Sequence, residues 1–559
     1  MAASAALAIT LVPVLMGYFI RGKILPEQKN PVNRTLINLY MPLLKKVLMF
    51  PKATLAVAGL FLVSALYPLN NIGSEFMPPL DEGDLMYMPT TYPGLSIGKA
   101  RELLQQTDKL IKTVPEVESV FGKIGRAETA TDPAPLTMIE TFIQLKPKEE
   151  WREGLTSKAL KKELDDLVKL PGLTNAWVMP IKTRIDMLAT GIKTPVGIKV
   201  AGPDLNVIQE IGQQLEQVLI KVDGTASVYS ERVAGGRYIK IDINRVKAAR
   251  YGLNISDIQQ VISTAIGGMN VTQTTEGLER YPINMRYPQD YRSSPEQLEL
   301  LPIITPSEQK ITLADVAQIK IESGPPGIKS ENARLNGWTF IDIENTDIGS
   351  YVKNAKQVVS DQVILPAGYS LNWSGQYEYM LRAKEKLMYV VPLTLAIIIV
   401  LLYMNFRNIT QVSILILSLP LSLVGSVWLM FALGFNFSIA VGVGMIALAG
   451  VAVETGVIML VYLDQAWDEL KRNSTQSTIK QSELVNAIEQ GAGLRVRPVL
   501  MTAGATIIGL LPIMYGDGTG SEVMSRLAAP MVGGMLSSVM LTLFVIPVVY
   551  LIWKARHIR

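Results

Sequence analysis

Long apolar segments constrain this chain more than any other feature of its sequence. They are residues 2–20 and 53–67 and, after a long polar stretch, 387–404, 412–433, 437–463, 499–515 and 530–553. Each is near or above the length of roughly 20 residues that crosses about 30 Å of hydrocarbon as a helix. A bilayer offers no water to bond with the backbone, so each segment must satisfy its own amides as a helix. The sequence therefore predicts a membrane bundle with seven crossings.

Basic residues predict the orientation of this bundle. Residues 21–52 carry Arg21, Lys23, Lys29, Arg34, Lys45, Lys46 and Lys52, and the loop 464–497 and the tail after residue 553 are also basic. The short loops 434–436 and 516–528 contain only Arg526. Loops rich in Lys and Arg stay in the cytoplasm. Alternation of the crossings then places the N-terminus and residues 70–385 outside.

Residues 70–385 read as a folded domain. Amphipathic helix patterns at 97–114, 160–170, 205–222, 255–266 and 352–362 alternate with β-rich runs at 85–88, 117–123, 138–145, 195–200, 238–243 and 338–343. The order strand–helix–strand–strand recurs, which is typical of small split βαβ units. The predicted fold is a membrane α-helical bundle with an α+β domain.

This pattern also predicts the domain boundaries. Residues 1–69 hold two membrane helices with a cytoplasmic loop at 21–52, residues 70–385 form the extracytoplasmic domain, and residues 386–559 form a five-helix bundle with a cytoplasmic tail.

Composition excludes several functions. The chain has no cysteine and a single histidine, His557, so disulfides, thiolate sites and histidine-based triads are absent. It lacks a phosphate loop, which argues against an enzyme, and it lacks a basic run with interleaved aromatics, which argues against nucleic acid. The 24 methionines remain as soft ligands. Thioethers suit Cu(I) and, by extension, Ag(I) better than Zn(II) or Co(II).

Glu454 lies near the middle of the apolar segment 437–463. A carboxylate at bilayer depth is costly and usually marks a proton or ion path. Gly442, Gly444, Ala447 and Gly450 would let other helices pack closely around it. A glutamate that is buried in the bundle for packing alone is the alternative interpretation.

Three methionines in the outer domain are candidate metal ligands. Met138 stands two residues before Glu140 on a predicted strand, hence on the same face. Met88 lies in LMYMPT and Met187 in RIDMLATG. Sequence spacing alone leaves open whether the three meet or fill gaps in a core.

Several long motifs resemble one family: GSEFMPPLDEGDLMYMP, GKIGRAETATDPAPLTMIET, RIDMLATGIKTPVGIKV, GGRYIKIDIN, EGLERYPINMRYP, GVAVETGV, LRVRP and GSEVMSRLAAPMVGGM. Over essentially the whole chain they are similar to the C-terminal part of the heavy-metal efflux pumps of the resistance–nodulation–division (RND) class, copper/silver type. The resemblance implies ferredoxin-like porter and docking regions and a homotrimeric proton antiporter of the bacterial inner membrane. It also implies a periplasmic membrane-fusion protein and an outer-membrane channel as partners, Cu(I) or Ag(I) as substrate, and no tightly bound cofactor.

The resemblance also assigns residues to roles. Met88, Met138 and Met187 match the family's metal-binding methionines, and Glu140, Lys193, Arg184 and Asp132 match residues that line the same cleft. Met524 matches a relay methionine of the membrane region, and Glu454 matches the proton-relay glutamate.

Two departures from the family pattern leave alternatives open. The lysine that the family carries after LRVRP is Val499 here. The chain resembles the family only from about its sixth membrane helix, so a separate N-terminal half-pump is a possible partner. Two alternatives therefore stay open: a zinc or cobalt pump of the same family, and a non-transporting remnant or scaffold. The low phenylalanine content disfavours a multidrug pump.

Overall fold

The computed structural model describes residues 2–19, 31–78, 80–125, 135–473, 480–516 and 518–556. The chain divides into two compact units. The membrane unit comprises Met1–Gly83, Thr346–Val352 and Gln376–Arg559, and the sheet unit comprises Asp84–Asn345 and Lys353–Gly375.

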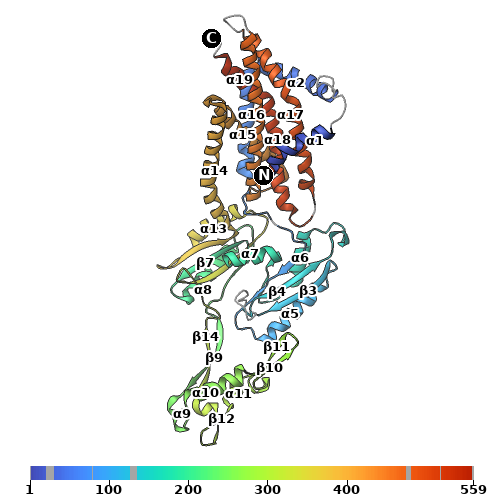
Figure 1. Ribbon diagram of the computed structural model, residues 1–559. Helices are drawn as coiled ribbons and strands as arrows, with labels where there is room; N and C mark the ends of the chain where they lie inside the picture. Colours follow the sequence, from blue (N-terminus) through green and yellow to red (C-terminus); the bar gives the residue numbers. More distant parts are fainter. Residues whose placement is uncertain are drawn as a thin grey trace. The chain divides into compact units, whose positions relative to one another are not determined.

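Helices make up the membrane unit (Figure 1). They are α1 (Ala2–Phe19), α2 (Pro31–Met49), α3 (Pro51–Ser64), α4 (Leu66–Asn71), α14 (Gln376–Phe406), α15 (Ile409–Leu433), α16 (Ile439–Asn473), α17 (Gln481–Tyr515), α18 (Ser521–Met540) and α19 (Ile546–Ala555), with a π-helical turn at Leu541–Val545 between the last two. Among the described residues, 6 helical segments are long and apolar enough to cross a membrane. The first predicted crossing is α1, whose apolar stretch, Ala6–Phe19, is shorter, so six of the seven predicted crossings reach that length.

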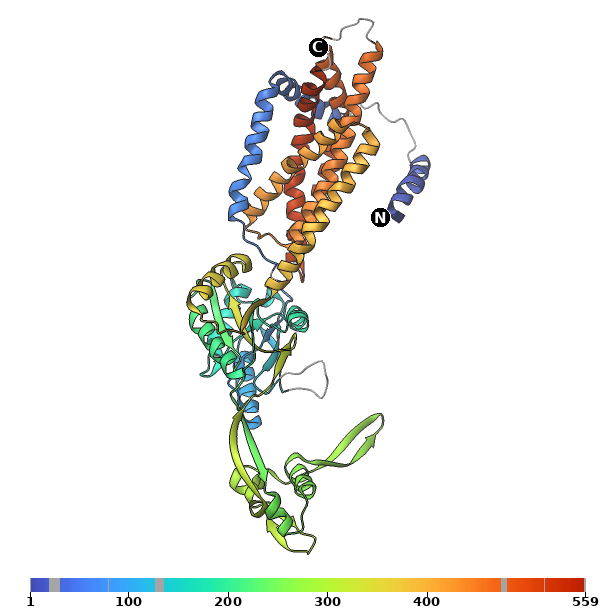
Figure 2. The ribbon, with the colours of Figure 1, turned by 90° about the vertical axis from the view of Figure 1, so that its left-hand side faces the viewer.

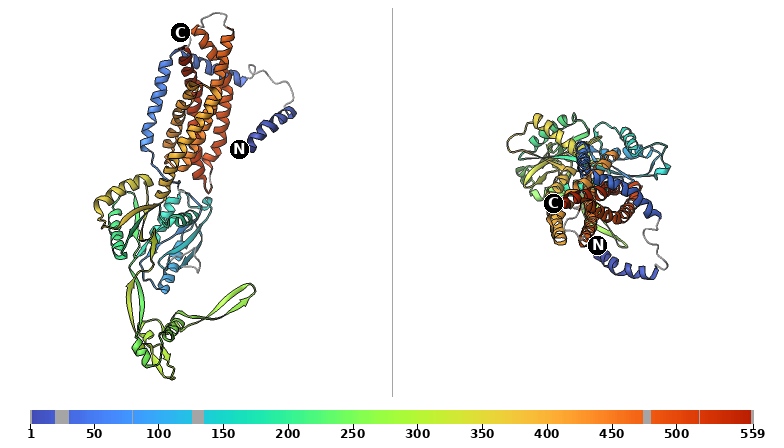
Figure 3. Two further views of the ribbon diagram at one scale, coloured as in Figure 1. Left: turned by 60° about the vertical axis from the view of Figure 1, so that its left-hand side comes forward. Right: turned by 90° about the horizontal axis from the view of Figure 1, so that it is seen from above.

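Small residues bring α15 and α18 into close contact. A Cβ atom at Gly425 would lie 2.1 Å from the carbonyl oxygen of Gly533, so only glycine fits there. Nearby, the Ser426 hydroxyl donates to the Pro530 carbonyl at 2.5 Å. Lipid tails are as apolar as leucine, so close backbone packing and interhelical hydrogen bonds hold such helices together. The long helices consequently run side by side through the bundle (Figure 3).

The predicted cytoplasmic loop contains a helix that packs against the bundle. Tyr40, Leu44 and Leu48 recur every four residues along α2 and are buried in the apolar cluster of the bundle. The Tyr40 hydroxyl donates to the Leu543 carbonyl at 2.7 Å. On the same helix, Lys45 forms an ion pair with Glu489 of α17 at 3.6 Å.

Two antiparallel sheets organise the sheet unit. The first has the order β3 (Val117–Ile124), β4 (Ile139–Leu145), β1 (Leu85–Tyr87) and β6 (Trp177–Val178), with α5 (Ile97–Lys112) and α6 (Ser157–Leu167) between strands in sequence. The second sheet has the order β15 (Lys329–Glu331), β16 (Arg334–Ile343), β7 (Val196–Gly202) and β17 (Ser370–Gly375). A fifth strand, β8 (Thr225–Ser230), also pairs with β16. The connecting helices of this sheet are α8 (Leu205–Leu219) and α13 (Ile348–Gln362). Both follow the strand–helix–strand–strand–helix–strand sequence of a ferredoxin-like unit, which confirms the predicted fold class.

An insertion between β8 and β16 forms a smaller subdomain. It contains β9 (Gly236–Ile243), α9 (Arg245–Arg250), α10 (Ile255–Ile262), β10 (Met269–Glu276), β11 (Glu279–Met285), α11 (Pro295–Glu299), β12 (Pro302–Ile304), β13 (Lys310–Thr312), α12 (Leu313–Val316) and β14 (Ala317–Gly324). Strands β9 and β14 pair along their whole length. The exposed β10–β11 hairpin projects from this subdomain (Figure 2).

An ion pair between the buried Glu116 and the half-exposed Arg152 stabilises the first sheet. The Glu116 side chain is 1% exposed and accepts hydrogen bonds from the Arg152 guanidinium at 2.6 and 2.9 Å. These bonds lower the pKa of Glu116 to about 2. A carboxylate with a lowered folded-state pKa stabilises the fold above its ordinary pKa, and this contribution is lost as the pH falls towards 2.

We therefore expect Arg152→Gln to destabilise this sheet, because Glu116 would be left buried without its cation. At pH 7 the amides of β3, β4 and α6 should exchange measurably faster in hydrogen-exchange mass spectrometry of the full chain in detergent. The difference from the unaltered chain should shrink as the pH approaches 2. An equal change in the control Arg250→Gln, at an exposed position, would contradict this prediction.

Candidate functional site

Alternation along β1 separates two faces of the first sheet. Leu85 and Tyr87 belong to the apolar cluster that Ile111 of α5 and Leu160 of α6 complete. Successive side chains of a strand point to opposite faces. Met86, and Met88 immediately beyond the strand, therefore point away from α5 and α6.

Strand register places two of the candidate ligands with Glu140. Tyr87 pairs with Thr141 in the antiparallel β1–β4 ladder, so Met88 lies opposite Glu140 at the next position. Beyond it, Thr90 and Met138 form an isolated antiparallel bridge. Residues that oppose each other across an antiparallel pair share a face. Met88, Met138 and Glu140 thus share the face opposite α5 and α6, where Met88 is fully buried and Glu140 is 2% exposed.

Glu140 carries two ion pairs although its side chain is only 2% exposed. Its Oε2 atom lies 2.9 Å from the Lys123 Nζ of β3 and 3.4 Å from the Arg184 guanidinium. Lys123 is the direct cross-strand partner of Glu140 in the β3–β4 register. Arg184 comes from the helix α7 (Pro180–Thr190), so this ion pair holds α7 against the methionine face of the sheet.

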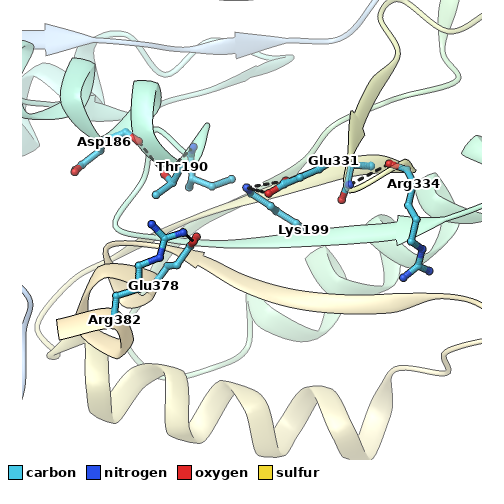
Figure 4. A network of polar contacts seen from close by, with 9 residues as sticks. Asp186, Thr190, Lys199, Glu331, Arg334, Glu378 and Arg382 are labelled. Atoms are coloured by element: carbon cyan, nitrogen blue, oxygen red, sulfur yellow. Dashed lines mark hydrogen bonds and ion pairs between the residues drawn. The ribbon is translucent and has the colours of Figure 1, made fainter. Parts of the chain in front are cut away.

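Met187 lies on the same helix, three residues after Arg184, and so on a neighbouring part of its surface. The helix ends at Gly191, whose N–H donates to the Met187 carbonyl at 2.8 Å. Met187, Thr190, Lys329, Glu331 and Trp338 are among the residues that line a cavity of about 360 Å³. Figure 4 shows Lys199 paired with Glu331 and the Thr190 hydroxyl bonded to the Asp186 carbonyl.

Lys193 supports the backbone at Met88. Its buried Nζ donates to the Met88 carbonyl at 3.0 Å and to the Thr90 hydroxyl at 2.6 Å. It also lies 5.4 Å from the centre of the Phe340 ring. Burial lowers the pKa of Lys193 to about 8. The lysine is therefore mostly charged at neutral pH and fixes the segment that presents Met88.

These contacts connect most of the residues that the sequence indicated. Met88, Met138, Glu140, Arg184 and Lys193 are joined by strand pairing, ion pairs or hydrogen bonds. Met187 lies on the helix of Arg184, but neither Met88 nor Met138 lines the cavity that Met187 lines. Asp132 lies outside the described residues. Met524 belongs to α18 of the membrane unit and is exposed there.

Sequence reasoning missed Lys123. Its position opposite Glu140 follows from the β3–β4 register, which no short motif reveals. Within the described ranges no group of three or more histidine, cysteine or acidic residues could hold a metal ion. The candidate metal ligands on this face are therefore neutral thioethers and one carboxylate, which already has cationic partners.

The exposure of the Glu454 side chain differs from the prediction. The sequence predicted burial inside the bundle, but its side chain is exposed on α16, so this expectation is wrong for the chain by itself. Gly444 does pack closely, because a Cβ there would lie 2.4 Å from the Leu527 carbonyl, whereas Gly442 and Gly450 face open space. Val499 is buried in the apolar cluster of the bundle. In the part of the chain that the structure describes, this face of α16 is uncovered around Glu454.

A multi-pass membrane bundle with two ferredoxin-like units is the architecture of a membrane transporter. The model of the AcrB/AcrD/AcrF family matches residues 1–554, and the chain belongs to this family of RND transporters, which are not enzymes. The predicted resemblance is thereby confirmed, and with it the placement of the chain as a multi-pass protein of the inner membrane.

Individual relatives are similar over the same range. The chain is 53% identical over 558 residues to the cation efflux system protein CusA of Escherichia coli (strain K12), covering 100% of the chain and 53% of that protein. It is likewise 53% identical, at the same coverage, to the putative cation efflux system protein SilA of Salmonella typhimurium. It is 34% identical over 552 residues to the cobalt-zinc-cadmium resistance protein CzcA of Cupriavidus metallidurans, covering 97% of the chain and 51% of that protein.

A solved structure has the same fold. The crystal structure of a heavy metal efflux pump (crystal form II) matches with a TM-score of 0.82 at 28% identity, covering 94% of this chain and 52% of that chain. The chain spans about half the length of the curated relatives it matches.

Gly191 offers a test of the geometry around α7. Its φ is +80°, and a Cβ there would lie 2.3 Å from the Trp338 ring. We expect Gly191→Ala to displace the end of α7 and to make the amides of α7 exchange measurably faster, since both the backbone and the indole resist the added methyl group. Hydrogen-exchange mass spectrometry of the full chain in detergent measures this.

Gly98→Ala is the matched control. Gly98 lies in α5 with nothing within 4 Å of its virtual Cβ, and alanine favours a helix. Equal exchange of the α7 amides in the two variants would contradict the role of Gly191.

Proposed function

We propose that the chain is the C-terminal part of an RND pump that exports Cu(I) and Ag(I) across the inner membrane in exchange for protons. The observation that carries this proposal is the shared sheet face of Met88 and Met138, to which the Arg184–Glu140 ion pair attaches the helix of Met187. The similarity to proteins named as cation efflux systems supports it.

The ligand chemistry favours soft monovalent ions. Thioethers are soft, uncharged donors that suit Cu(I) and Ag(I), while Zn(II) prefers imidazole, thiolate or carboxylate. Met88, Met138 and Met187 would bind the ion, with Glu140, Lys193 and Arg184 around them. We also retain Asp132 as a lining residue and Met524 as a relay methionine in the membrane unit, both on the family resemblance.

Glu454 is the proposed proton carrier. It is the acidic residue near the middle of α16, and a carboxylate at that depth needs a functional reason or a partner. Its exposed position suits contact with further helices of the whole pump. Val499 replaces the expected cation of the relay, so another group would balance the charge of Glu454.

The assembly is proposed from the family as well. The chain spans about half the length of its relatives, and we propose a separate N-terminal half-pump as one partner. We propose a homotrimer that works with a periplasmic membrane-fusion protein and an outer-membrane channel. The domain boundaries at 69/70 and 385/386 stay a proposal, with residues 70–385 in the periplasm.

Silver binding tests the metal site. We expect the full chain in detergent to bind Ag(I) more tightly than Zn(II) in titration calorimetry, and Met88→Leu to weaken Ag(I) binding at least tenfold, because leucine keeps the volume but removes the sulfur. Met269→Leu is the control, since Met269 is exposed in the β10–β11 hairpin. Tighter binding of Zn(II) to the unaltered chain would favour the zinc or cobalt alternative instead.

Proton coupling tests the role of Glu454. In proteoliposomes that contain this chain co-expressed with the first half of a relative, Glu454→Gln should abolish silver-linked proton flux. The amide imitates the protonated carboxyl but cannot exchange a proton. Silver binding to the variant should remain unchanged. Undiminished flux would return Glu454 to a packing role, and no transport by the unaltered pair would favour the remnant or scaffold.

A further inference from the structure

The last membrane span contains a turn that departs from α-helical geometry. Helices α18 and α19 are joined by the π-helical turn Leu541–Val545, in which the N–H of Ile546 donates to the carbonyl of Leu541, five residues earlier. Such turns are rare in helices and frequently coincide with functional sites. We propose that this turn is the hinge of the last membrane span and that Tyr40 of α2 is the latch that holds it. The inference goes beyond the proposed function and is independent of which ion is transported.

A proline creates the need for the latch. In an α-helix the carbonyl of Leu543 would accept a hydrogen bond from the N–H of residue 547. Residue 547 is proline, which has no N–H. An unpaired backbone carbonyl in a buried position is costly, and Leu543 is 4% exposed. The Leu543 carbonyl accepts from the Tyr40 hydroxyl at 2.7 Å, so a side chain of α2 supplies the bond that the proline removes.

Tyr40 contacts the turn with its ring as well as its hydroxyl. The side chain is buried, and the centre of its ring lies 5.5 Å from the centre of the Phe544 ring. Leu44 and Leu48, about one and two turns further along α2, belong to the same apolar cluster of the bundle. These contacts hold α2 against the turn, with the tyrosine hydroxyl bonded to its backbone.

The two halves of the span are held by different partners. Before the turn, the Ser537 hydroxyl of α18 donates to the Ser422 carbonyl of α15 at 2.5 Å. After the turn, the Tyr550 hydroxyl of α19 donates to the Asp464 carboxylate of α16 at 2.7 Å. A change of shape between these two halves would therefore be concentrated in the turn. Because α18 carries Met524, the hinge would let the part of the span with the proposed relay methionine move while α19 stays attached to α16.

A purely structural role for Tyr40 makes a different prediction. If the tyrosine only helped α2 to dock, its loss would loosen α17 as well as α2, because Lys45 of α2 pairs with Glu489 of α17 at the same interface. If the tyrosine latches the hinge, loss of the hydroxyl should loosen the turn and the residues after it, while the ring and the leucines keep α2 in place. Tyr40→Phe separates the two cases because it removes only the hydroxyl.

Hydrogen-exchange mass spectrometry of the full chain in detergent is the first measurement. We expect Tyr40→Phe to speed exchange roughly fivefold at the amides of residues 541–551, the effect of one lost hydrogen bond, with α2 and α17 unchanged. Tyr389→Phe is the matched control, since Tyr389 is exposed on α14. Pro547→Ala restores an N–H at this position, so Tyr40→Phe should have little effect in that background.

Spin labels measure the bending of the span. The chain has no cysteine, so Leu536→Cys in α18 and Arg556→Cys after α19 introduce labels at exposed positions on either side of the turn. A helix of this length spans about 30 Å, and double electron–electron resonance gives the distribution of distances between the two labels. We expect Tyr40→Phe to broaden this distribution and Pro547→Ala to narrow it.

Unchanged exchange and an unchanged distance distribution in Tyr40→Phe would overturn the inference. Equal acceleration of exchange in α2 and α17 would also overturn it, because the tyrosine would then only help α2 to dock. If Tyr40→Phe fails to fold, Pro547→Ala decides: it should slow exchange in the turn, and no change in exchange or distance would refute the hinge. Silver binding plays no part in these measurements, so their failure would leave the proposed function intact.

Discussion

Side-chain alternation along β1 and β4 is the constraint on which the candidate site depends. One set of side chains, with Tyr87 and Ile143 among them, enters the apolar core beneath α5 and α6. The alternate set includes Met88 and Glu140. A shift of one residue in the pairing would exchange the two faces and bury the carboxylate in the apolar core. The free energy of burying that core therefore also fixes the position of the ligands.

Much of this arrangement could be predicted from the sequence. The order of helical and β-rich patterns predicts split βαβ units, and the spacing of Met138 and Glu140 puts them on one face. Other parts depend on distant pairing. The bond between Lys193 and the Met88 carbonyl joins residues that are 105 positions apart, and no local pattern encodes it. Helix α7 was missed because it is short and has no clear apolar periodicity.

The membrane helices illustrate a related limit. Apolar length predicts that a segment spans the bilayer, but it does not say which face of the helix is covered. Gly444 packs against α18, whereas Gly450 and Glu454 lie on an open face of the same helix. The basic residues of 21–52 predict a loop, yet the spacing of Tyr40, Leu44 and Leu48 in α2 encodes an apolar stripe. In both cases the surface that packs against the helix, and not the helix itself, decides which of its side chains are buried.

The β9–β14 ribbon has a consequence for the second sheet. Its two strands pair from Gly236–Gly324 to Ile243–Ala317, so the insertion leaves and re-enters the second sheet at adjacent points. To strands β8 and β16, which pair with each other, the whole inserted subdomain is equivalent to the tip of a hairpin. The entropy of closing a loop grows only slowly with its length. The sheet thus tolerates, at a small cost in free energy, an insertion of almost any length at this point.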